Sequence, residues 1–219
     1  MPKITSVEPQ IKNPKRFNIF LDGIFAFGAD EDLVVDSRLV VGKEISAEDL
    51  EKILFEAEVG KLMERMYRLF SIRQRSEKEI REYLKNLSFK RKISDKEKIS
   101  EQAMELLIKK LKQKGLINDK EFAKAWVEAR RRSKKKGKIV LKQELFQKGI
   151  NREIIEEVIS GGSVEDEEKL ALQALEKKSR SLEKLTPLEF RKKAYEFLLR
   201  RGFEYEDVKK VIENFLKKR

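Results

Sequence analysis

The most regular feature of this sequence is a helical pattern of hydrophobic positions that occurs three times. Two copies surround Gly149 and Gly202, and the same apolar spacing precedes and follows each glycine. Their members are Leu141, Leu145, Gly149, Ile150, Ile155 and Val158, and then Ala194, Leu198, Gly202, Phe203, Val208 and Val211. A looser copy begins with Ile80, Leu84, Ser88 and Phe89. Self-similarity at a nearly fixed period predicts stacked helical units, which offer a long curved surface to an extended partner.

The first forty-odd residues follow a different pattern. Aromatic and β-branched runs at 16–21 and 24–27 flank Asp22 and Gly23, where a tight hairpin turn needs positive φ, so we predict a β-hairpin. Residues 4–11 are predicted to add a third strand, 30–39 a short helix and 40–45 an extended segment. Ser46 is expected to cap a helix that runs to about residue 69, with Gly60 as the site of a bend.

We expect three helices in each of the three units. In the middle unit, Asn118 or Asp119 caps the first helix, Gly149 ends the second and Asn151 caps the third. The predicted fold is therefore mainly α, with tandem three-helix repeats in an elongated curved array and a small N-terminal head that contains a β-hairpin. The predicted domains are the head with its connecting helix at 1–60 and three repeats at 61–117, 118–162 and 163–219.

Charge is unevenly distributed along the 219 residues. The chain has 51 Lys and Arg against 39 Asp and Glu, a formal net charge of +12. Residues 1–60 contain 7 of these basic and 12 of these acidic side chains, so an acidic head precedes a basic body. A basic body favours nucleic acid, or a partner that is acidic or coated with nucleic acid.

The strongest candidate for an interaction site is a run of cations between Glu128 and Glu144 that contains no acidic residue. Eight like charges without compensation repel one another, so we predict that they neutralise phosphates or carboxylates of a partner. A weaker strip at the start of the repeats includes two further arginines, for which surface ion pairs are the simpler interpretation. The predicted interface comprises Arg130, Arg131, Arg132, Lys134, Lys135, Lys136, Lys138 and Lys142, together with Arg73 and Arg75.

Trp126 is the only tryptophan, and it follows Phe122 by four residues, which is core spacing on a helix. We therefore predict that it packs in the core and does not stack on a base. Few other aromatic residues are expected to be exposed, and this argues against a protein that binds single strands by stacking.

Catalytic and cofactor chemistry has little support in the sequence. The chain has no histidine and no cysteine, which removes Ser-His-Asp and Cys-His nucleophiles and the commonest metal ligands. No Gly-Lys pair has the earlier glycine of a P-loop. The acidic residues Asp30, Glu31, Asp32 and Asp36 lack the glycine of a calcium loop, and helix capping explains them. We predict that the chain is not an enzyme and has no cofactor and no metal site.

The sequence shows no mark of secretion or of a membrane. The N-terminus is charged from Lys3 onward, and no apolar run approaches the ~18 residues of a membrane span. We therefore expect a cytoplasmic protein.

Three segments resemble the RecX family of regulators. Residues 69–80, LFSIRQRSEKEI, are similar to the opening of that family's first unit. The segment that starts GLINDKEFA at 115 and reaches Arg130 resembles its most recognisable element, and LKQELFQKGINREII at 141–155 resembles a further one. The head is similar to the N-terminal extension of longer members. The chain departs from the family at Ser88, where a glycine is expected, and at 90–100, which adds a basic polar stretch.

The resemblance implies a protein that binds the recombinase RecA on single-stranded DNA and inhibits its ATPase, strand exchange and filament growth. It places this activity in homologous recombination, DNA repair and the SOS response, and we expect the chain to act as a monomer. The residues alone indicate only an elongated polyanionic partner. Two alternatives stay open: a general nucleic-acid-binding module that needs no recombinase, and a metal-dependent nuclease that uses acids of the head.

Overall fold

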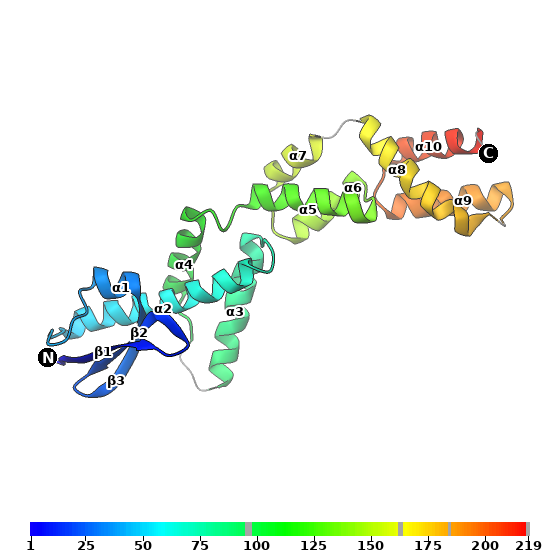
Figure 1. Cartoon of the computed structure of the whole chain (residues 1–219). Helices are drawn as coiled ribbons and strands as arrows, with labels where there is room; N and C mark the ends of the chain where they lie inside the picture. The colour runs from blue at the N-terminus through cyan, green and yellow to red at the C-terminus, as the bar shows by residue number, and fades with distance from the viewer. Residues whose placement is uncertain (95–97, 162–163, 184, 218–219) are drawn as a thin grey trace. The chain divides into compact units, whose positions relative to one another are not determined.

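The structure of this chain is a computed structural model that describes residues 1–94, 98–161, 164–183 and 185–217 (Figure 1). The fold is mainly α-helical with one small antiparallel sheet at the N-terminus, as predicted. Two compact units contain the chain: Met1–Gln74 with Arg81–Ile117 form the first, and Arg75–Ile80 with Asn118–Arg219 form the second. The division into a head and three repeats stays a prediction.

A three-stranded sheet opens the first unit, with strands β1 (Ile4–Gln10), β2 (Asn13–Leu21) and β3 (Ile24–Asp30) in the order β1-β2-β3. All neighbours are antiparallel. Asp22 and Gly23 have φ of 49° and 82°, which confirms the predicted hairpin between β2 and β3. Residues 4–10 form the predicted third strand.

Two helices follow the sheet. Helix α1 (Glu31–Asp36) is shorter than predicted and is capped by Asp30, whose Oδ1 accepts a hydrogen bond from the Leu33 N–H at 3.0 Å. Helix α2 (Ala47–Phe70) has the predicted Ser46 cap and continues unbroken through Gly60, so the predicted boundary at residue 60 lies inside a helix. A Cβ at Gly60 would lie 2.4 Å from Asp30 Oδ2, so the glycine gives room for that carboxylate.

The core of this part joins one face of the sheet to α1 and α2. Its side chains come from all three strands, from both helices and from the segment between the helices. They are Ile4, Ile19, Phe27, Ala29, Leu33, Leu39, Ile45, Ile53 and Ala57. The segment predicted as extended, 40–45, forms no regular strand: Val41 and Gly42 are a turn, and Glu44 forms an isolated antiparallel bridge to Lys3.

The looser copy of the repeat differs from its prediction. Helix α3 (Glu77–Ile93) does not end at Ser88, and Phe89 is exposed. Instead, Ser88 Oγ accepts a hydrogen bond from the Ile99 N–H at 3.1 Å, and Ile99 is buried directly before the Ser100 cap of α4 (Glu101–Gln113). The residue that corresponds to Ile150 is therefore Ile99, because the longer α3 moves the core position beyond the added polar stretch.

The second unit contains the remaining helices: α5 (Asp119–Lys134), α6 (Lys138–Gln147), α7 (Arg152–Ser160), α8 (Val164–Ser179), α9 (Pro187–Arg200) and α10 (Tyr205–Lys217). Asn118 and Asn151 cap α5 and α7 through their side-chain oxygens, as predicted. Gly149 and Gly202 have φ of 78° and 87°, which confirms left-handed residues after α6 and α9. One core lies among α5, α6 and α7, and another among α8, α9 and α10.

A backbone junction connects these two helix groups within the second unit. The Gly137 N–H donates to the Arg201 carbonyl at 2.9 Å, and the Ile139 N–H donates to the Gly202 carbonyl at 3.0 Å. A Cβ on Gly137 would lie 2.4 Å from the Gly202 carbonyl oxygen. Glycine is therefore required here because the start of α6 packs backbone to backbone against the turn after α9.

Candidate interaction surface on α5 and α6

The predicted block of eight cations spans the end of α5 and the beginning of α6. Lys135 ends α5 in a left-handed conformation with φ of 48°, and Gly137 precedes the first residue of α6. Both helices belong to the second unit, and we call this set of eight cations the α5–α6 surface. It consists of Arg130, Arg131, Arg132, Lys134, Lys135, Lys136, Lys138 and Lys142.

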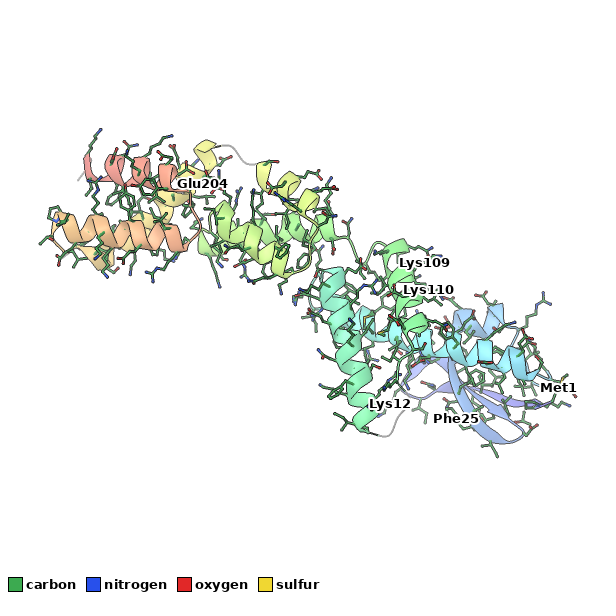
Figure 2. The ribbon with its side chains drawn as sticks, turned by 180° about the vertical axis from the view of Figure 1, so that it is seen from behind. Met1, Lys12, Phe25, Lys109, Lys110 and Glu204 are labelled. Carbon is green, nitrogen blue, oxygen red and sulfur yellow. The ribbon has the colours of Figure 1, made fainter. Side chains whose placement is uncertain are left out.

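The prediction that this block lacks compensating acids is wrong. Six of the eight cations form ion pairs, with carboxylates supplied by α5, α6, α7, α8 and the turn before α10. The pairs are Arg130 with Glu144 at 3.0 Å, Arg131 with Glu167 at 2.5 Å, Arg132 with Glu128, Lys136 with Glu144, Lys138 with Glu204 at 3.0 Å and Lys142 with Glu156 at 2.6 Å. Figure 2 labels Glu204, one of these acids. In the described part of the chain, Lys134 and Lys135 have no carboxylate partner.

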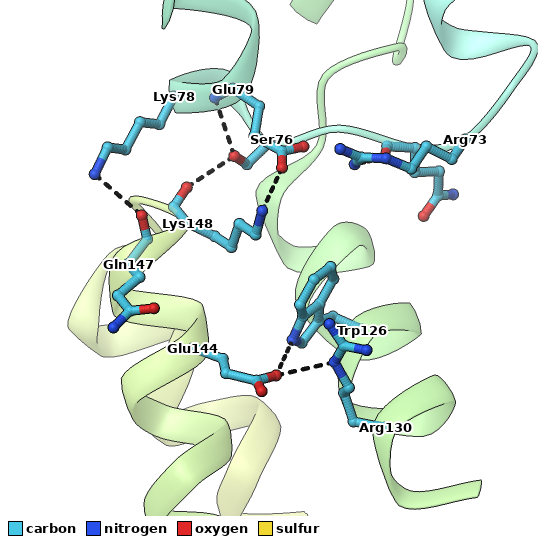
Figure 3. Close-up of polar contacts among 10 residues, drawn as sticks. Arg73, Ser76, Lys78, Glu79, Trp126, Arg130, Glu144, Gln147 and Lys148 are labelled. Atoms are coloured by element: carbon cyan, nitrogen blue, oxygen red, sulfur yellow. Dashed lines mark hydrogen bonds and ion pairs between the residues drawn. The ribbon is translucent and has the colours of Figure 1, made fainter. Parts of the chain in front are cut away.

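Glu144 is shared by three donors. Its Oε2 accepts from Trp126 Nε1 at 2.8 Å and from Arg130 Nε at 3.0 Å (Figure 3), and its Oε1 accepts from Lys136. Burial raises the pKa of Glu144, but the hydrogen bonds from Lys136 and Trp126 and the charges of Lys136 and Arg130 outweigh it. Its pKa therefore lies below the ordinary value, and Glu144 holds its cations as a carboxylate.

Trp126 packs against the core of α5, α6 and α7, as its spacing predicted, but it is only partly buried. Its ring stacks on Phe122 with centroids 5.7 Å apart. The Arg130 guanidinium lies 4.2 Å from the ring centroid and the Lys148 ammonium 5.1 Å. The indole is thus in contact with Phe122 and with these two cations, and it contributes to packing within the second unit.

A second shared acid, Glu167 of α8, is buried with 3% of its surface exposed. Its Oε1 pairs with Arg131, and its Oε2 accepts a hydrogen bond from the Lys138 backbone N–H at 3.3 Å. Burial raises the pKa of Glu167, and the charge of Arg131 opposes that rise. Arg131 therefore joins α5 to α8, and its charge is largely enclosed.

The cations of the α5–α6 surface thus fall into two groups. An inner group is at most 29% exposed and pairs with half-buried or buried carboxylates, except that Lys138 pairs with the more exposed Glu204. It consists of Arg130, Arg131, Lys136 and Lys138. An outer group is in exposed pairs or has no acidic partner among the described residues, and it consists of Arg132, Lys134, Lys135 and Lys142. A pocket of about 480 Å³ is lined by Arg131, Arg132 and Lys135 together with the apolar side chains Val127, Val158 and Leu170.

The two remaining predicted residues, Arg73 and Arg75, belong to different units. Arg73 is exposed, and its Nη1 donates to the Gln74 carbonyl at 2.9 Å. Arg75 is half-buried, and its Nε has no acceptor among the described residues. Among the described residues, no hydrogen bond or ion pair joins Arg75 to the α5–α6 surface.

The segment after Arg75 is fixed to the turn between α6 and α7 (Figure 3). Ser76 Oγ donates to the Lys148 carbonyl at 2.7 Å, and Lys78 Nζ donates to the Gln147 carbonyl at 3.0 Å. Lys148 Nζ pairs with Glu79 at 2.6 Å. These contacts lie within the second unit and fix the start of α3 against the end of α6.

The expectation of few exposed aromatic residues is also wrong. Among the described residues, Phe25, Phe89, Phe146, Tyr205 and Tyr67 are each 45% or more exposed. The sequence did not predict their exposure because an aromatic residue inside a helical or strand pattern is interpreted as a buried core residue.

Across the described ranges, no group of three or more Asp, Glu, His or Cys side chains is arranged to hold a metal ion. No helix in these ranges has both the length and the apolar composition to cross a membrane.

Comparison with known proteins identifies the family. Residues 118–159 match the second three-helix domain of RecX, and residues 165–212 match the third. Residues 2–46 match the N-terminal domain of the regulatory protein RecX. The chain belongs to the RecX family. The resemblance seen in the sequence is therefore confirmed, and the α5–α6 surface lies in the second three-helix domain of a RecX-family regulator.

Relatives and solved structures agree with this assignment. The regulatory protein RecX of Bacillus velezensis is 35% identical over 213 residues, which are 97% of this chain and 77% of the relative. The regulatory protein RecX of Listeria monocytogenes serovar 1/2a is 33% identical over 208 residues, which are 93% of this chain and 72% of the relative. A crystal structure of regulatory protein RecX has a TM-score of 0.74 and 27% identity and covers 98% of this chain and 100% of its own. The crystal structure of RecX from Lactobacillus salivarius has a TM-score of 0.57 and 24% identity. It covers 71% of this chain and 95% of its own, which shows the shared fold.

Proposed function

We propose that this RecX-family regulator binds the filament of the recombinase RecA on single-stranded DNA and inhibits it. The inhibited activities are ATP hydrolysis, strand exchange and filament growth during recombinational repair and the SOS response. Membership of the RecX family carries the proposal. In this account the protein acts in the cytoplasm as a monomer, by binding alone, with no cofactor and no catalytic step of its own.

We assign the contact with the filament to the α5–α6 surface. The ion pairs indicate which of its cations stabilise the fold and which contact a partner. The inner cations hold α5, α6 and α8 together, because their partner carboxylates are shared between helices. The outer cations are available to phosphates or acidic side chains, since Lys134 and Lys135 have no carboxylate partner among the described residues and the pairs of Arg132 and Lys142 are exposed. The exposed pair of Arg132 with Glu128 is worth less than about 1 kcal/mol, so a partner anion replaces Glu128 at little cost.

The outer cations together supply long-range attraction that salt weakens. Arg132 and Lys134 are exposed at the end of α5, and Lys142 is 39% exposed on α6. Each phosphate that a cation neutralises releases counterions, so binding weakens steeply as salt rises.

The test is the DNA-dependent ATP hydrolysis of RecA on single-stranded DNA, with this protein added well below one copy per recombinase. The proposal expects hydrolysis to stop at substoichiometric amounts, because a filament-directed inhibitor acts on many subunits. Loss only when there is enough protein to cover the DNA would contradict it. That result would support the alternative function, a nucleic-acid-binding module that competes for the strand.

A charge-reversal variant tests the assigned surface. Arg132→Glu with Lys134→Glu changes two exposed outer cations and leaves every inner pair in place, so inhibition should fall while the helical circular dichroism stays unchanged. The matched control is Lys109→Glu with Lys110→Glu, two exposed cations of α4 labelled in Figure 2, which changes the net charge equally. Equal loss of inhibition in both variants would mean that net charge, and not this surface, governs binding.

A further inference from the structure

The first unit has a groove with a different composition from the α5–α6 surface. It has a volume of about 1020 Å³ and is lined by β3, α2, α3 and the residues before and at the start of α4. All of these residues belong to the first unit. Small-molecule pockets measure roughly 300–1,000 Å³. The volume of this groove lies at the upper end of that range, so the groove has room for a segment of a polymer.

Basic side chains outnumber acidic ones in the lining of this groove. Lys61 and Arg65 come from α2, Lys90 from α3 and Lys98 from the segment before α4, and all four are exposed. Among the described residues, no carboxylate forms an ion pair with any of them. The fifth cation, Arg91, pairs with Glu58 at 2.5 Å and thereby neutralises one of the two lining glutamates.

An exposed aromatic ring lies at the same groove. Phe25, on β3 next to the hairpin turn and labelled in Figure 2, is 55% exposed. Its cross-strand partner Phe20 meets it edge to face, with centroids 6.0 Å apart and an interplanar angle of 78°, and this contact holds the ring in place. Leu54 of α2, also 43% exposed, adds a further apolar position.

We infer that this groove binds single-stranded nucleic acid, with the sugar-phosphate backbone along the four unpaired cations and a base stacked on Phe25. A positively charged groove combined with an exposed aromatic ring is the arrangement that recognises single strands without regard to sequence. The cations are single charges spread over three segments of the chain, and such a spread suits phosphates that recur along a strand. The inference needs no recombinase and does not depend on the proposed function.

The experiment measures binding of the full chain alone to a fluorescent oligo-deoxythymidylate by anisotropy, with a length of about 16 nucleotides. Phe25→Ala should weaken binding at least roughly fivefold, as expected from the loss of one base–aromatic stack. Phe25→Tyr keeps the ring and should bind like the wild type. Phe25→Leu keeps an apolar side chain without a ring and should be as weak as Phe25→Ala.

The cations are tested by Lys61→Gln with Arg65→Gln, which should weaken binding severalfold more than the control Lys109→Gln with Lys110→Gln. The control removes the same charge from α4 outside the groove. Thermal melts of each variant show whether the fold is retained. Wild-type affinity in Phe25→Ala would overturn the inference. Wild-type affinity in Phe25→Leu would also overturn it, since an apolar side chain without a ring would then be sufficient and no base would stack on Phe25. Because recombinase is absent, neither result bears on the proposed inhibition.

Discussion

Two basic regions of this chain differ in the source of their counter-charge. On the α5–α6 surface, carboxylates from several helices reach six of the eight cations. In the groove beside Phe25, only Arg91 has such a partner among the described residues. The first region has the larger number of cations and the second the larger share of unpaired ones. The number of cations in a stretch of chain therefore does not measure the charge that a partner meets.

This difference in pairing distinguishes cations that stabilise the fold from cations that bind a partner. A cation whose carboxylate is buried, such as Arg131 beside Glu167, cannot leave its partner without exposing an uncompensated charge to an apolar environment. A cation with no partner, such as Lys61, loses only water when a phosphate arrives. The inner cations of the α5–α6 surface are thus expected to govern stability, and the groove cations to govern binding.

The largest expected effect comes from Gly137→Ala, which disrupts the backbone junction between the start of α6 and the turn after α9. The ion pair of Lys138 with Glu204 depends on that junction. The new Cβ would meet the Gly202 carbonyl oxygen at 2.4 Å, and the backbone on both sides would have to shift. The free energy of unfolding should fall by about 3 kcal/mol or more in urea denaturation. The control is Gly161→Ala, where the nearest atom is 3.8 Å from the new Cβ. Similar losses in the two variants would contradict a specific junction.

The next effect is expected from Arg131→Ala, which leaves the buried Glu167 without its ion-pair partner. We expect a loss of about 2–3 kcal/mol, below the usual range for a broken buried pair because Glu167 retains the Lys138 N–H and takes up a proton readily. Urea denaturation measures the change. Arg132→Ala, which breaks an exposed pair, and Lys61→Ala, which breaks none, should each stay within about 0.5 kcal/mol. If Lys61→Ala costs as much as Arg131→Ala, the contrast between the two regions fails.

A smaller effect is expected from Glu144→Gln, which keeps the side-chain shape but removes the charge shared by Arg130 and Lys136. The loss should be about 1–2 kcal/mol at neutral pH. The pKa of Glu144 in the folded state lies below 4.5, so its contribution is present above pH 4.5 and disappears as pH falls through the folded value. The difference in unfolding free energy between wild type and variant should therefore shrink below pH 4.5. A difference that stays constant with pH would contradict a role for the carboxylate charge.

Local features of this fold could be predicted from the sequence because neighbouring residues determine them. The hairpin at Asp22 and Gly23 follows from the φ values that its turn needs, and the caps at Ser46 and Asn118 follow from side chains that bond within three residues. The family could be identified from segments of the second three-helix domain, which the comparison matches at residues 118–159.

Features that depend on tertiary packing could not be predicted. Arg131 and Glu167 are 36 positions apart, and no spacing rule connects them. Ile99 takes the core position predicted for Phe89 only because α3 continues past Ser88. Phe25 is two residues from the buried Phe27, so alternation along β3 predicts that it is buried too. The pairing of β2 with β3 shifts register between these two positions, with one extra residue in β3, and Phe25 is exposed.

The central claim is that pairing with carboxylates, and not the number of cations, decides which side chains reach phosphates. The most direct test is the salt dependence of binding to single-stranded DNA for two variants with the same net charge. Lys61→Gln with Arg65→Gln removes two groove cations, and Lys136→Gln with Lys138→Gln removes two inner cations of the α5–α6 surface. We predict that the slope of log K against log salt decreases in magnitude by about 1.4 in the groove variant and is unchanged in the other. Equal decreases in both variants would contradict the claim, since net charge alone would then explain the binding.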